Sequence, residues 1–181
     1  MSLIALAATA LLSVQTTIPA PRYSESDVVR LERCVLGGDD IATCGDFSVE
    51  VEALTTCAAQ ADLSGGPEAF VEAWNRCDDH ALPCWWEKPE PGQSALVVRN
   101  CSARGVATRK IIAARWLDQL DRQLTPADRA LLLQVEKRMF EGLEMPADSD
   151  DPLRASGRWS GTWASYLQFL RIAQLSGKVT P

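Results

Sequence analysis

The chain has 181 residues, of which 46% are hydrophobic, and its formal net charge is −6 at pH 7. The acidic balance argues against nucleic acid and against anionic membrane surfaces as partners, because both would repel the protein. A cationic protein partner is compatible with the same charge.

The first twenty residues carry no charged side chain, and Leu3 to Val14 consists mainly of Leu, Ala, Ile and Val. This stretch is too short to span a bilayer, which takes about 20 apolar residues. It predicts a secretory signal peptide at 1–20, cleaved after Ala20, although its start carries no Lys or Arg. The alternative is an uncleaved apolar N-terminal helix. Cleavage leaves 21–181 as a single helical domain with no stable membrane insertion.

Capping signals and apolar spacing predict three helices in the cysteine-rich half, residues 24–101. Serines that can cap helix N-termini predict helices over 24–36 and 48–57. Pro67 follows a Gly-Gly break and suits the first turn of the third helix. Residues 80–92 contain three prolines and are predicted to form a loop.

The cysteine-free half, residues 102–177, continues the helical pattern. The longest periodic run is 94–124, with a kink or break allowed at Gly105 because glycine costs about 1 kcal/mol relative to alanine in a helix. Thr125-Pro126-Ala127-Asp128 predicts the start of a helix that reaches about Glu144. The last helix is expected to begin near Trp159 or Thr162, after a loop over 145–156, and to end at Gly177. Its expected buried stripe is Trp159, Trp163, Tyr166, Leu170 and Ala173.

No alternating run of strand length is present, so the sequence predicts an all-α fold of five to seven helices. The basic residues of the long helix are predicted to form a solvated face. These residues are Arg104, Arg109, Lys110 and Arg115.

Six cysteines follow the leader in two similar triplets. An even number of cysteines behind an export signal predicts a disulfide framework and an oxidising compartment, periplasmic or secreted. Fifteen pairings are possible, and the duplicated layout favours one of them: Cys34–Cys77, Cys44–Cys57 and Cys84–Cys101. A metal site or redox centre is the alternative. It is disfavoured because the chain has no Cys-x-x-Cys and a single histidine, so we expect no metal and no cofactor.

No catalytic motif stands out in the chain. His80 follows two aspartates and could act as a general base, but no Gly-x-Ser-x-Gly nucleophile element accompanies it. We therefore assign no catalytic residue and expect a protein that is not an enzyme. The segment Trp85, Trp86 and Glu87 lies in the proline-rich loop and is the predicted binding segment, because tryptophan is favoured at interface hot spots. The alternative is that both rings cover neighbouring helices.

The segment from Cys84 through Gln123 resembles the LprI-type lysozyme-inhibitor family of exported bacterial proteins. Members combine a cysteine-rich N-terminal segment with a long helix that has a cysteine near its start and then a Trp followed by Leu-Asn at helical spacing. The counterparts here are Cys84, Cys101, Trp116, Leu120 and Asp121, with Leu124 one turn later. The family's Gln-x-x-Trp pattern in a second helix is replaced by Glu136 and Met139.

The resemblance implies an exported, all-α binding protein whose partner is a cationic lysozyme-like enzyme. Two functions of other classes stay open from the sequence. One is an envelope hydrolase that works through carboxylates. The other is a helical adaptor subunit of an envelope complex, whose apolar groove accepts a partner helix.

Overall fold

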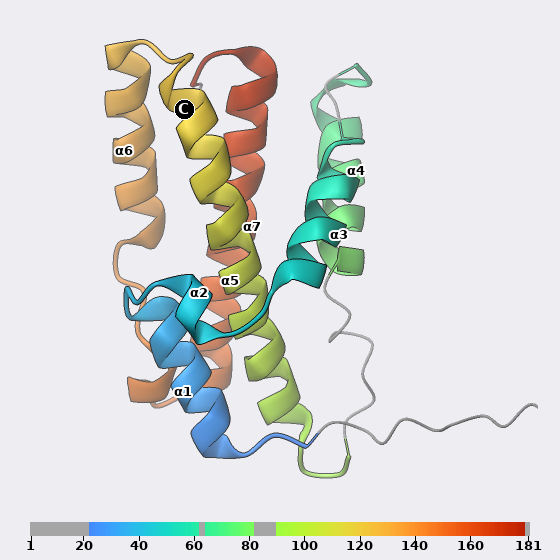
Figure 1. Cartoon of the computed structure of the whole chain (residues 1–181), viewed down its shortest axis with the longest axis vertical. Helices are drawn as coiled ribbons and strands as arrows, with labels where there is room; N and C mark the ends of the chain where they lie inside the picture. Colours follow the sequence, from blue (N-terminus) through green and yellow to red (C-terminus); the bar gives the residue numbers. More distant parts are fainter. Residues whose placement is uncertain (1–21, 62–63, 82–89, 180–181) are drawn as a thin grey trace, which may run out of the picture.

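The computed structural model describes residues 22–61, 64–81 and 90–179, and every regular element in these ranges is helical (Figure 1). This confirms the predicted all-α fold. The predicted leader, 1–20, lies outside the described residues. In chain order the elements are α1 (Glu25–Leu36), α2 (Ile41–Cys44), α3 (Ser48–Ala58), α4 (Gly66–Ala81), α5 (Ser94–Asp121), α6 (Pro126–Phe140), the 3-10 turn η2 (Pro146–Asp148) and α7 (Pro152–Ser176).

Helix α5 is the axis of the fold, with α6 on one side of it and the α3–α4 pair on the other, and α7 packs along its length (Figure 1). Helices α1 and α2 cover its N-terminal half. Helices α5 and α7 run parallel. Arg109 of α5 is hydrogen-bonded to Ser160 of α7, and further along both helices Gln119 is hydrogen-bonded to Gln174. Because neighbours surround it, the middle of α5 is buried on most sides, and Gly105 lies inside an unbroken helix.

Local capping explains where most helices begin. Ser24 Oγ accepts a hydrogen bond from Asp27 N, and Thr125 Oγ1 accepts one from Asp128 N, as the sequence predicts. Gly177 ends α7 in the left-handed conformation, with φ of 68°, which glycine adopts without steric cost.

Two predicted boundaries are wrong, and one short helix was missed. The last helix begins at Pro152 rather than near Trp159, because the Asp151 side chain accepts a hydrogen bond from Arg154 N and Pro152 suits the first turn. Helix α6 ends at Phe140 rather than at Glu144. The short helix α2 was not predicted; its N-cap is Asp40, which accepts a hydrogen bond from Ala42 N.

Two disulfides have both cysteines among the described residues, and their connectivity corrects the predicted one. Cys34 pairs with Cys44 and Cys57 pairs with Cys77, so the predicted pairs Cys34–Cys77 and Cys44–Cys57 are wrong. Each real bridge joins neighbouring elements: α1 to α2, and α3 to α4. The similar triplets therefore reflect no duplicated bridging scheme. Cys101 is disulfide-bonded, and the predicted partner Cys84 lies outside the described residues.

Removal of the second bridge, in the double variant Cys57→Ser/Cys77→Ser, should lower the free energy of unfolding by about 3 kcal/mol. The reason is that the bridge closes a loop with a sequence separation of 20 and restricts the unfolded chain. Urea unfolding followed by circular dichroism measures the change. A loss below about 1 kcal/mol would mean that the packing of α3 on α4 does not depend on the covalent link.

Candidate functional site

A groove of about 710 Å³ lies between α3, α5 and the loop that joins α2 to α3. Its apolar lining comes from Phe47, Val51 and Ile111. The hydroxyls of Ser48, Thr55 and Thr56 and the charged groups of Asp46, Glu52 and Arg115 complete it. We call it the α3–α5 groove.

Backbone geometry and one arginine place the loop that forms one end of the groove. Gly45 has φ of 153° and ψ of −179°, a conformation that is accessible almost only to glycine, and it turns the chain from α2 toward Phe47. Arg104 of α5 then holds the loop. Its guanidinium lies 5.2 Å from the centre of the Phe47 ring, and it donates to the Asp46 carbonyl at 3.1 Å. The same side chain donates from Nε to Glu50 at 2.7 Å, so loop and helix α3 are fixed to α5 together.

The environment of Asp46, at one end of the groove lining, does not suit a general acid. Asp46 accepts a hydrogen bond from Ser48 N at 2.9 Å, and this bond lowers the pKa of the Asp46 carboxyl. A general acid in a glycoside hydrolase needs the opposite shift, so Asp46 does not fit that role. It lines the groove together with Glu52, and Arg115 is exposed on α5.

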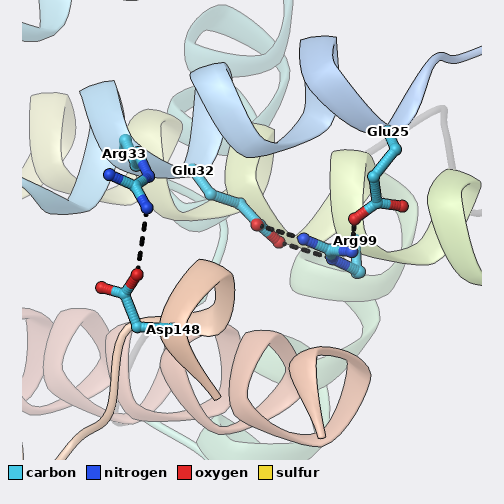
Figure 2. A network of polar contacts seen from close by, with 5 residues as sticks. All are labelled: Glu25, Glu32, Arg33, Arg99 and Asp148. Atoms are coloured by element: carbon cyan, nitrogen blue, oxygen red, sulfur yellow. Dashed lines mark hydrogen bonds and ion pairs between the residues drawn. The ribbon is translucent and has the colours of Figure 1, made fainter. Parts of the chain in front are cut away.

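A second polar cluster lies beneath α1 and is structural (Figure 2). Arg99 of α5 donates from Nε and Nη2 to the two oxygens of Glu32, at 3.0 and 2.6 Å, and both side chains are almost fully buried. Its Nη1 reaches Glu25 in the first turn of α1 at 2.5 Å. The hydrogen bond with Glu32, followed by that with Glu25, raises the pKa of Arg99. At the edge, exposed Arg33 and Asp148 join α1 to η2 at 3.0 Å.

The predicted solvated basic face of α5 is wrong for three of its four residues. Arg109 is buried and donates to Ser160 at 3.3 Å, and Arg104 is partly buried against Glu50. Lys110 donates to the Val35 carbonyl at 2.7 Å, and burial lowers the pKa of its ammonium group. Among the four residues, Arg115 is the exposed one.

The predicted binding segment, Trp85, Trp86 and Glu87, lies outside the described residues and stays a prediction. His80 lies in the last turn of α4 rather than in the predicted loop. The predicted stripe of the last helix is largely confirmed: Tyr166, Leu170 and Ala173 are buried, and Trp159 and Trp163 are partly buried. Because this stripe packs inside the fold, it gives no support to an adaptor that would dock a partner on the last helix.

Sequence reasoning missed the groove and the buried ion pairs, although one signal for the pairs was present. Glu32 shares the buried face of α1 with Val28 and Val35, at helical spacing. A carboxylate on such a face needs a buried cation as partner. The sequence has no comparable pattern for the groove, because the groove forms where α3 and the loop before it meet α5, which is distant in the chain.

No group of His, Cys and acidic residues among the described residues is arranged to hold a metal ion. In the same ranges, no helix has both the length and the apolar composition that a membrane crossing requires. No family model matches the chain, and neither the curated proteins nor the solved structures contain a significant match.

Proposed function

We propose that the chain is an exported helical binding protein that accepts an apolar segment of a protein partner in the α3–α5 groove. The observation that carries the proposal is the groove itself, whose lining combines apolar side chains with hydroxyls and charged groups. Such a combination buries apolar partner side chains and fixes their orientation through a few polar contacts. The disulfides support export, because disulfides persist mainly in the periplasm or outside the cell.

A cationic partner fits the charges best. Asp46 and Glu52 line the groove, and the chain as a whole carries a net charge of −6. Opposite charge on the partner would speed association and suppress acidic competitors. The resemblance to lysozyme inhibitors makes a lysozyme-type muramidase the first partner to test.

Two groove variants should weaken binding to a lysozyme-type muramidase, measured by biolayer interferometry and by inhibition of muramidase activity. Thr56→Arg places a long side chain at the exposed edge of the groove and should lower affinity by about tenfold or more. Glu52→Lys reverses a charge at the groove and should slow association several-fold at low salt, with a smaller effect at about 0.5 M salt.

Glu141→Lys is the matched control, because it makes the same charge change at an exposed residue outside the groove. Equal losses in Glu141→Lys and Glu52→Lys would show that net charge, not the groove, drives association. Absence of binding by the unmodified protein would remove lysozyme-type enzymes as the partner class. If Trp85→Ala/Trp86→Ala loses binding while both groove variants keep it, the partner binds the predicted tryptophan segment and not the groove.

A further inference from the structure

Arg171 of α7 lies inside the fold without an anionic partner. Its guanidinium is 5.8 Å from the centre of the Trp116 ring, on the parallel helix α5. The residue is partly buried, and its Nε atom is buried with no hydrogen-bond acceptor. Within the described residues its side chain makes no ion pair, and its guanidinium lies against an aromatic face.

The other inner cations of the fold show how unusual this is. Arg99 meets two carboxylates, Arg104 meets Glu50, and Lys110 meets the Val35 carbonyl. A cation that leaves water without an acceptor costs free energy. In Arg171, burial disfavours the charged form of the guanidinium and so lowers its pKa. The fold therefore keeps a partly buried guanidinium whose buried Nε–H donates no hydrogen bond.

Two glutamines lie one turn further along the two helices: Gln174 follows Arg171 on α7, and Gln119 follows Trp116 on α5. Gln174 Nε2 donates to Gln119 Oε1 at 2.9 Å, and Gln174 Oε1 is buried without a partner. A bond between Arg171 Nε and this oxygen would satisfy both atoms. It would leave the positive charge uncompensated, because the amide is neutral. An anionic oxygen group would satisfy the donor and the charge together.

We propose that Arg171, held on the face of Trp116, is a binding site for an anionic oxygen group, a carboxylate or a phosphate. A guanidinium offers two parallel N–H donors to either group, and stacking on an indole fixes the plane of those donors. The site involves α5 and α7 and none of the residues that line the α3–α5 groove, so it stands independently of the proposed function.

Titration of the ¹⁵N-labelled protein with inorganic phosphate, and separately with acetate, tests the site in a buffer of low chloride. The Nε–H resonance of Arg171, assigned by its loss in Arg171→Gln, should move in a saturable way. The anion that saturates at the lower concentration identifies the preferred group.

The backbone amide resonances of Trp116 and its neighbours on α5 report binding in the variants, and by this readout Arg171→Gln should weaken binding by about tenfold or more. The control Arg138→Gln, at an exposed arginine of α6, should bind as the unmodified protein does. A shift that does not saturate with either anion, or full binding by Arg171→Gln, would overturn the proposal.

A thermal measurement separates a ligand site from a structural arginine. Because the unpaired charge costs stability in the free protein, Arg171→Met should leave the unfolding temperature unchanged or raise it by about 2–4 °C. If Arg171 instead stabilises the fold through Gln174, Arg171→Met should lower the unfolding temperature, and the proposal would fail.

Discussion

Arg99→Met should lower the free energy of unfolding by about 3–5 kcal/mol, measured by urea denaturation at pH 7. The Glu32 carboxylate accepts two hydrogen bonds from Arg99, and both side chains are almost fully buried. Methionine fills a similar volume but donates nothing, so the variant leaves a buried carboxylate unpaired. The penalty is the cost of that orphaned charge rather than the net stability of the pair.

Arg33→Met is the matched control, because Arg33 and Asp148 form an exposed ion pair in the same view (Figure 2). The side chains of that pair are 61% and 62% exposed, and an exposed pair contributes about 1 kcal/mol or less. The double variant Arg99→Met/Glu32→Met should recover most of the loss, because it removes both charges together. Equal effects of Arg99→Met and Arg33→Met would contradict the buried pairing.

The sequence predicts the helices well where a cap and an apolar stripe agree. The caps Ser24 and Thr125 accept hydrogen bonds from backbone groups three residues away, and Gly177 ends a helix through its own backbone conformation. Their roles can therefore be predicted from local chemistry. The start of α7 was missed because an acidic, proline-containing stretch suggested a loop, whereas Asp151-Pro152 is an N-cap followed by a first-turn proline.

Features set by tertiary contacts could not be predicted in the same way. The disulfide pairing depends on which helices become neighbours, and a repeated spacing carries no information on that. The burial of Arg104 and Arg109 depends on α5 being surrounded, which the sequence of α5 alone does not reveal. The α3–α5 groove depends on the position of Phe47, which Arg104 fixes from a residue 57 positions away in the chain.

The aromatic contact between α4 and α5 is the second feature on which the fold strongly depends. Trp74 is 1% exposed, and its ring centre lies 6.1 Å from that of Trp116 on α5 and 6.1 Å from that of Phe70 on α4. The Cys57–Cys77 bridge ties α4 to α3, so the two helices form one covalently closed hairpin. Loss of the Trp74 side chain should therefore weaken the packing of α3 and α4 together against α5.

Trp74→Ala should lower the free energy of unfolding by about 3–5 kcal/mol, because the cavity it leaves cannot be filled by stapled helices. Val71→Ala is the control: Val71 lies one turn away on α4 and is 40% exposed, so its loss should stay within about 0.5 kcal/mol. Hydrogen exchange followed by mass spectrometry should show faster exchange in both α3 and α4 of Trp74→Ala, with α5 and α7 still protected. Faster exchange in α4 alone would mean that α3 holds to α5 without the hairpin, through Arg104 and its bond to Glu50. In that case the α3–α5 groove would survive the substitution, and the proposed binding to a muramidase would be expected to persist in Trp74→Ala.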